Sequence, residues 1–210
     1  MLQSSLGFEF PTESHNLALP DADIVYEPDF LNGEEADILM QSLQDTLAWR
    51  QDHIRVCGRD VLIPRLQAWY GEPEAQYTYS GLLMTPHDWT RTLRDLKTRC
   101  EQRCDCRFNS VLANLYRDGS DSMGMHSDDE PELGALPTIA SLTLGATRVF
   151  KLKHKHTAEV VDLPLGNGSL LVMKGKTQQF WQHGINKTKR SVAARMNLTF
   201  RYILAIKNEL

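Results

Sequence analysis

The residues best suited to chemistry lie in the segment Met123 to Glu130, where an imidazole and a carboxylate stand two positions apart. On an extended strand His126 and Asp128 would leave from the same face, because side chains alternate with a period of two. A third candidate ligand, His183, follows 55 residues after Asp128. Any one of these residues is weak evidence, but together they predict a metal centre.

The ligand types indicate what the metal would do. Two histidines and one carboxylate form the facial triad of non-haem Fe(II) oxygenases, in which the remaining coordination positions stay open for a chelating cosubstrate and O2. The hypothesis requires that the strands between Asp128 and His183 bring these two residues together across a small barrel.

A strand-like stretch near the C-terminus predicts the charge of that cosubstrate. Its alternate residues are polar on one face (Arg195, Asn197, Thr199 and Arg201) and apolar on the other (Met196, Leu198 and Phe200). The apolar face should pack on the core, so the polar face must meet water or a charged ligand. Because arginine pairs with carboxylates in bidentate geometry, we expect a dicarboxylate inside the barrel. Asn114 and Tyr116, on one face of another predicted strand, could add polar contacts.

Two amphipathic helices should cover a sheet. The first begins with Asn32 as N-cap, followed at helical spacing by Ala36, Leu39, Met40, Leu43 and Leu47. The second begins with Asp88 as N-cap and carries the apolar stripe Trp89, Leu93, Leu96 and Cys100.

The rest of the chain is predicted to form about eight short strands separated by turn residues. They lie around residues 63–70, 108–117, 138–144, 147–154, 159–163, 169–173, 180–184 and 196–205. This order favours a mainly β fold with flanking helices, a jelly roll or related closed sandwich, over a βαβ repeat.

Length and composition fit one domain of 210 residues. We expect residues 1–23 to be a poorly structured acidic arm and residues 24–210 to be the domain. No signal peptide or membrane-length apolar run is apparent, so we expect an intracellular protein, in the cytoplasm or, in a eukaryote, in the nucleus. We also expect a monomer. The cysteines, Cys57, Cys100, Cys104 and Cys106, are then expected to be reduced, and their spacing matches no common zinc pattern.

The net charge of −4 is unevenly distributed. Residues 1–49 contain ten acids and no Lys or Arg, which leaves 17 acids and 23 bases, a net charge of +6, in residues 50–210. This asymmetry permits a basic face on the domain, although an evenly charged body would give the same count.

Several segments together resemble the AlkB-like Fe(II)/2-oxoglutarate dioxygenases, and within them the animal-type DNA and RNA repair demethylases. The resemblance covers most of residues 25–205 and rests on Pro64–Gly71, Tyr77–Gly81, Asn109–Glu130, Ile139–Phe150, Trp181–His183 and Arg195–Arg201. It implies a double-stranded β-helix in which His126, Asp128 and His183 bind Fe(II). Arg195 should hold the distal carboxylate of 2-oxoglutarate, assisted by Asn114, Tyr116, Asn197 and Arg201.

The same resemblance implies a substrate and a way to hold it. An N-methylated base of the 1-methyladenine or 3-methylcytosine type, in DNA and with RNA open as a second substrate, would lose its methyl group as formaldehyde while 2-oxoglutarate becomes succinate and CO2. The base must leave the duplex or come from a single strand. Tyr79 and His126 would sandwich it, with Tyr77, Asp129 and Glu130 nearby. Residues 53–81 would form a recognition lid, and phosphates would meet Arg55, Arg59, Arg65, Lys187, Lys189 and Arg190.

Two other functions stay open on the residues. The same iron core could serve a protein or small-molecule hydroxylase, because a fold does not decide its substrate. The barrel could also be a non-catalytic module that senses 2-oxoglutarate or iron, although such a module would not need an open coordination position.

Overall fold

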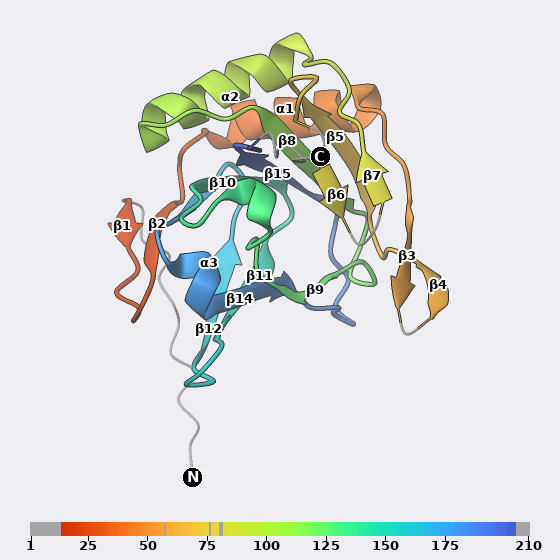
Figure 1. The fold of residues 1–210 in the computed structure, drawn as a ribbon. Helices are drawn as coiled ribbons and strands as arrows, with labels where there is room; N and C mark the ends of the chain where they lie inside the picture. Colours follow the sequence, from red (N-terminus) through yellow and green to blue (C-terminus); the bar gives the residue numbers. More distant parts are fainter. Residues whose placement is uncertain (1–13, 57, 76, 80–81, 205–210) are drawn as a thin grey trace, which may run out of the picture.

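The computed structural model describes residues 14–56, 58–75, 77–79 and 82–204. Two antiparallel sheets face each other in a jelly roll, as the sequence predicted (Figure 1). The larger sheet has the order β1 (His15–Asn16), β2 (Asp23–Glu27), β13 (Leu170–Lys174), β10 (Ile139–Gly145), β15 (Arg195–Arg201), β8 (Ser110–Tyr116) and β5 (Leu66–Gly71). The smaller has the order β12 (Val160–Leu165), β11 (Arg148–His154), β14 (Trp181–Ile185) and β9 (Met123–His126).

Helices α1 (Gly33–Thr46) and α2 (Arg91–Cys104) cover the outer face of the larger sheet (Figure 1). The Asn32 side chain accepts a hydrogen bond from the Glu35 N–H at 2.9 Å, so the predicted cap of α1 is confirmed. The cap of α2 was predicted wrongly. Thr90, and not Asp88, accepts the Leu93 N–H at 3.2 Å, because its hydroxyl lies three residues before that amide.

The main core lies between these helices and the larger sheet. The strand residues of this core are alternate residues that point to the same side of the sheet, among them Leu142, Leu144, Met196, Leu198 and Phe200. They pack against the helix residues Leu43, Leu93, Leu96 and Cys100. Each such leucine stabilises the fold by about 2 kcal/mol on burial. The apolar face of the last strand therefore packs on the helices, as predicted, and its polar face points between the sheets.

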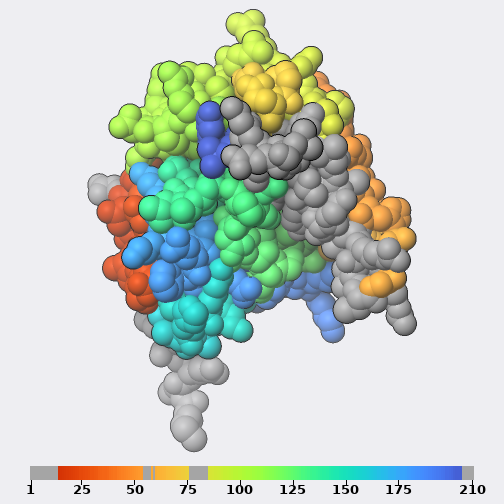
Figure 2. Space-filling model, viewed as in Figure 1, coloured from red at the N-terminus to blue at the C-terminus, as the bar shows by residue number. Residues whose placement is uncertain are grey.

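A second apolar cluster fills part of the space between the two sheets. It includes Tyr26 of β2, Phe150 and Leu152 of β11, and Trp181 and Ile185 of β14. The remaining interior is lined by polar side chains from β8, β10 and β15, together with the ends of β9 and β14. Figure 2 shows one face of the molecule, with α2 in yellow-green above and β11 and β12 in cyan below.

The predicted strands occur within a few residues of their expected bounds, but the sequence did not indicate β1 and β2. These two strands pair through His15 with Tyr26 and Asn16 with Val25. The first regular structure of the described chain, β1, therefore lies within residues 1–23, the segment expected to be an arm. Residues 1–13 lie outside the described part. The metal motif also differs from a continuous strand, because β9 ends at His126 and Asp128 follows in the next turn.

Two hairpins occupy the region expected to be the lid. They are β3 (His53–Val56) with β4 (Arg59–Leu62), and β6 (Tyr77–Tyr79) with β7 (Leu82–Met84). The first projects from the body at the right of Figure 1. Two short helical turns complete the fold, η1 (Pro131–Leu133) and α3 (Thr177–Phe180). Among the described residues, no helix has the length and apolar character that crossing a membrane requires.

Candidate active site

The three predicted metal ligands converge where the end of β9 lies beside the middle of β14. His126 of β9 pairs directly with His183 of β14 in the smaller sheet. Asp128 Oδ1 lies 3.8 Å from His126 Nε2, and Asp128 Oδ2 lies 3.8 Å from His183 Nε2. One ligand atom from each residue lies within 4.8 Å of the other two. This spacing allows one ion to contact all three, so the fold brings the predicted triad together.

Hydrogen bonds orient each ligand around that centre. The Gly124 carbonyl oxygen lies 2.9 Å from His126 Nδ1 and can only accept, so Nδ1 carries the proton and Nε2 offers its lone pair to a metal. The Asp128 N–H donates to Gln178 Oε1 at 2.9 Å, and the Ser127 hydroxyl donates to the Trp181 carbonyl at 2.9 Å. These bonds hold the turn after β9 against α3 and β14.

The charges favour metal-binding protonation states. Burial alone would raise the pKa of Asp128, but Arg201 and the two histidines outweigh it and hold that pKa below its usual value. Burial is the main reason that the pKa of His183 is lowered to about 3. An ionised carboxylate and a neutral imidazole are the forms that bind metal ions. Two imidazoles and one carboxylate, which leave coordination positions open, fit Fe(II).

A pocket for an anion lies beside the triad, on the inner face of the larger sheet. Arg195 is directly opposite Tyr116, and Asn197 is opposite Asn114. The Arg195 guanidinium lies over the Tyr116 ring, 5.3 Å from its centroid, and donates to Thr143 Oγ1 at 3.0 Å. Burial lowers the pKa of Arg195 to about 10, so the side chain stays cationic at neutral pH.

Two donors in this pocket lack an acceptor. The Nε atoms of Arg195 and Arg201 are buried and have no hydrogen-bond partner among the described residues. Buried donors are nearly always satisfied. Arg201 has the Asp128 carboxylate as its counter-charge, whereas Arg195 has none among the described residues, and a buried cation without a counter-charge is destabilising by several kcal/mol. Both arginines line the same cavity as the triad. The pocket therefore has the electrostatics of a site for a carboxylate-bearing ligand.

Two asparagines of the pocket, Asn197 and Asn114, differ in how many of their side-chain hydrogen bonds are already made within the described residues. Asn197 Nδ2 donates to Ser141 Oγ at 2.7 Å and to the Leu142 carbonyl at 3.1 Å, and its Oδ1 accepts from Thr199. Asn197 therefore orders the pocket wall. Asn114 Oδ1 accepts from Arg65 Nε at 2.8 Å, which leaves the Asn114 amide nitrogen as a donor toward the cavity.

The position of Arg65 corrects the prediction that it meets phosphates. Arg65 is 4% exposed and bonded to Asn114, so its side chain belongs to the interior. The sequence could not indicate this, because the bond joins positions 49 residues apart. Lys187, Lys189 and Arg190 are exposed in the segment after β14, as a phosphate contact would require.

The candidate base contacts are placed only in part. Asp129 follows the triad carboxylate, is half exposed, and pairs with Lys155. Glu130 Oε2 is buried and lacks a hydrogen-bond partner among the described residues. The backbones of Tyr77 and Tyr79 lie in β6 and those of Arg55 and Arg59 in the first hairpin. The side chains of these four residues lie outside the described part.

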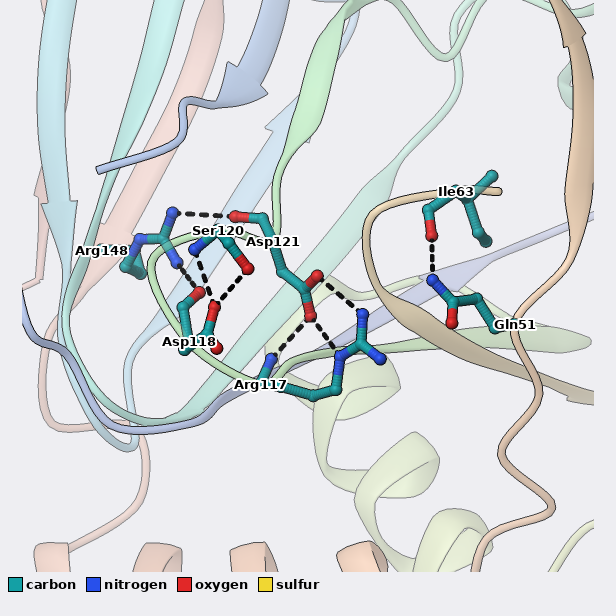
Figure 3. Close-up of polar contacts among 7 residues, drawn as sticks. All are labelled: Gln51, Ile63, Arg117, Asp118, Ser120, Asp121 and Arg148. Carbon is teal, nitrogen blue, oxygen red and sulfur yellow. Dashed lines mark hydrogen bonds and ion pairs between the residues drawn. The ribbon is translucent and has the colours of Figure 1, made fainter. Parts of the chain in front are cut away.

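The loop before β9 is held by contacts that the sequence did not indicate (Figure 3). Arg148 is buried and donates to the carbonyls of Asp118, Asp121 and Asn186 at 3.0, 3.1 and 2.7 Å. On the other side of the loop, Arg117 forms a two-pronged ion pair with the Asp121 carboxylate. Arg148 therefore connects the loop that precedes β9 with the exposed basic segment that follows β14.

The base of the first hairpin is tied to the same loop. Gln51 Nε2 donates to the Ile63 carbonyl at 2.8 Å and closes the base of the hairpin (Figure 3). The next carbonyl, that of Pro64, accepts from the Ser122 N–H at 2.8 Å, one residue before β9. This hydrogen bond connects the base of the hairpin to the start of the strand that ends in His126.

Comparisons with known proteins agree with this fold and site. The model of the 2OG-Fe(II) oxygenase superfamily matches residues 23–201. A jelly roll with a two-histidine, one-carboxylate centre and an adjoining anion pocket defines that class of protein. The chain belongs to this superfamily and to its AlkB-like branch.

The relatives are substantially similar over most of the chain. The protein of Homo sapiens called alpha-ketoglutarate-dependent dioxygenase alkB homolog 3 is 43% identical over 189 residues, which are 84% of this chain and 64% of that protein. The protein of Mus musculus called DNA oxidative demethylase ALKBH2 is 40% identical over 184 residues, 82% of this chain and 77% of that protein. The solved structure of OsALKBH1 has a TM-score of 0.62 at 19% identity, covers 85% of this chain and 97% of its own, and supports the fold alone.

Proposed function

We propose that the protein is an oxidative demethylase of N-alkylated nucleobases, of the 1-methyladenine or 3-methylcytosine type, in DNA and in RNA. The observation that carries the proposal is the pair of buried, unsatisfied arginine Nε donors beside a complete iron-type triad. The names of the relatives, a dioxygenase and a DNA oxidative demethylase, support the choice of reaction.

The chain's own residues would position a dicarboxylate next to the metal. Arg195 would bind the far carboxylate of 2-oxoglutarate, because it is a buried cation of the anion pocket whose Nε has no acceptor among the described residues. The Asn114 amide nitrogen and the Tyr116 hydroxyl would add hydrogen bonds, while Asn197 keeps the pocket wall in place. Arg201, whose Nη2 lies 3.0 Å from Asp128 Oδ1, would connect this pocket to the metal ligand.

Bound iron, with O2 and 2-oxoglutarate, would supply the chemistry that transfers one oxygen atom to the N-methyl carbon. The resulting N-hydroxymethyl group is unstable and leaves as formaldehyde, while 2-oxoglutarate leaves as succinate and CO2. The apolar cavity wall, formed by Met123, Phe150, Met173 and Ile185, would keep bulk water from the reacting atoms.

The substrate base would lie between the triad and the two hairpins. Tyr79 and His126 would stack on its faces, and Tyr77, Asp129 and Glu130 would line its edge. Carboxylates suit this position, since methylation leaves the ring positively charged. Arg55 and Arg59 of the first hairpin, with Lys187, Lys189 and Arg190, would hold phosphates without reading sequence. One chain holds the whole triad and pocket, so we propose a monomer that acts inside the cell, where DNA and RNA lie.

The test is reconstitution with Fe(II) without air, followed by air, 2-oxoglutarate and an oligonucleotide containing 1-methyladenine or 3-methylcytosine. Mass spectrometry of the bases and an assay for formaldehyde should show the loss of one methyl group per succinate formed. Asp128→Ala should abolish both products. Succinate without demethylation would assign the chain to another hydroxylase substrate, and an absence of both products would leave only a binding module.

A further inference from the structure

An ion pair outside the triad links a lysine to the carboxylate that follows the metal ligand. Lys155 Nζ lies 3.0 Å from Asp129 Oδ2, with side chains that are 24% and 54% exposed. The same ammonium donates to the Gln178 carbonyl at 2.9 Å. The lysine ammonium therefore connects the Asp129 carboxylate to the backbone of Gln178.

Gln178 also forms a hydrogen bond with the metal ligand Asp128. Gln178 lies in α3, and its side-chain oxygen accepts the Asp128 N–H at 2.9 Å. The backbone of Lys155 is anchored too, because its N–H donates to the Phe180 carbonyl at 2.7 Å. One helical turn thus determines where the Asp128 amide and the Lys155 ammonium lie, and through them the direction of the next carboxylate.

At this edge of the site, each of the two carboxylates Asp128 and Asp129 is therefore paired with a cation. Asp128 faces Arg201 at 3.0 Å, and Asp129 faces Lys155 at the same distance. A carboxylate paired with an ammonium still accepts hydrogen bonds through its second oxygen. It attracts a cation less than an unpaired carboxylate does, because the ammonium repels that cation at nearly the same range.

We infer that Lys155 is a specificity-determining positioning residue, which offsets the charge of Asp129 and so limits the preference of the site for a cationic methylated base over a neutral one. The inference rests on the proposed function, because it assumes that a methylated base lies beside Asp129. Specificity is a difference between two affinities, and a charge that opposes only the cationic substrate changes that difference.

The experiment compares two substrates that differ in charge. Single-stranded oligonucleotides of one sequence carry either 1-methyladenine, which is cationic, or 1-methylguanine, which is neutral. The measured quantity is the ratio of kcat/KM for the two substrates at saturating 2-oxoglutarate. Lys155→Met should raise this ratio about two- to fivefold, the range expected for a half-exposed charge pair. Lys155→Arg, which keeps the charge, should return the ratio to that of the parent protein.

Two controls separate this role from other roles of a lysine. Lys153→Met removes an exposed lysine two positions earlier, in β11, and weaker phosphate binding there would act on both substrates equally, so the ratio should not change. Asp129→Asn should lower the ratio, and adding Lys155→Met to it should then have no effect, because the lysine acts through Asp129. Affinity for Mn(II), measured by calorimetry, should stay unchanged in the Lys155 variants and shows that they fold.

The outcomes are distinct. An unchanged or lowered ratio in Lys155→Met, or a change that persists in the Asp129→Asn background, would overturn the inference while demethylation by the parent protein stands. A parent protein that demethylates neither oligonucleotide would instead overturn the proposed function, and the inference with it.

Discussion

Arg201 and Asp128 form a buried ion pair, with 3.0 Å between the arginine Nη2 and the carboxylate Oδ1. Asp128 is thereby shared between a cation of the anion pocket and the metal position. In the metal-free protein the arginine is the main compensation for the buried carboxylate, and it is the largest of the causes that lower the pKa of Asp128. A bound metal ion and Arg201 would thus compensate the same carboxylate, so the effect of removing Arg201 on stability should depend on whether metal is bound.

Arg201→Gln should therefore destabilise the metal-free protein by about 3 kcal/mol, because it leaves a buried carboxylate without its cation. Mn(II) should restore much of that loss by compensating the same carboxylate. Urea denaturation with and without Mn(II) measures both effects. Arg107→Gln, at a side chain that is 83% exposed, should change stability by less than about 0.5 kcal/mol. An equal loss with and without metal would argue against the shared carboxylate.

Arg195→Met should weaken binding of the dicarboxylate without affecting the metal. Removing one partner of a buried charge pair costs about 3 kcal/mol, or roughly 150-fold in affinity. Calorimetry with N-oxalylglycine, an unreactive analogue of 2-oxoglutarate, and Mn(II) gives both affinities separately. Arg195→Lys should bind the analogue more tightly than Arg195→Met does. Arg91→Met, a control at an exposed arginine of α2, should bind it as the parent protein does. Unchanged analogue binding in Arg195→Met would place the anion elsewhere.

Gln178→Leu should weaken metal binding although Gln178 is no metal ligand. Its side chain holds the Asp128 N–H at 2.9 Å, and removal of such a supporting hydrogen bond typically lowers metal affinity about 10- to 100-fold. Anaerobic titration with Fe(II) or Mn(II) measures the change. The neighbouring Gln179 donates to the Ala135 carbonyl on an exposed edge, so Gln179→Leu serves as the matched control. Equal effects of the two variants would mean that the hydrogen bond at Asp128 has no special role.

The metal-free protein should lose stability as the pH falls below about 6.5, because of His183. In the unfolded chain this imidazole takes up a proton near pH 6.5, whereas burial keeps it neutral in the fold until its pKa of about 3. The unfolded state therefore binds more protons between these values, so the contribution is complete above pH 6.5 and is lost progressively toward pH 3. The slope can reach about 1.4 kcal/mol per pH unit.

Urea denaturation of the metal-free protein across this pH range measures the slope. His183→Gln should reduce this slope by up to about 1.4 kcal/mol per pH unit, which is the contribution of one proton. A slope that survives in His183→Gln would assign the pH dependence to other groups.

Local patterns in the sequence were sufficient to predict the frame of the site. The alternation in Arg195–Arg201 assigned polar and apolar faces correctly, because the two-residue period of a strand does not depend on what surrounds it. The cap at Asn32 could be predicted for a similar reason, since its bond spans only three residues. The choice of Asp88 over Thr90 shows the limit of such local rules where two good caps stand close together.

What the sequence determined by itself was the chemical inventory, which is two imidazoles, a carboxylate and two arginines, together with the polar and apolar faces of Arg195–Arg201. Tertiary structure alone decided which groups meet. It buried Arg65 against Asn114, tied Asp128 to Gln178 and Asp129 to Lys155, across 49, 50 and 26 positions of chain. The physical reason is that such contacts depend on strand order and on the closing of the two sheets, which no local period or cap encodes.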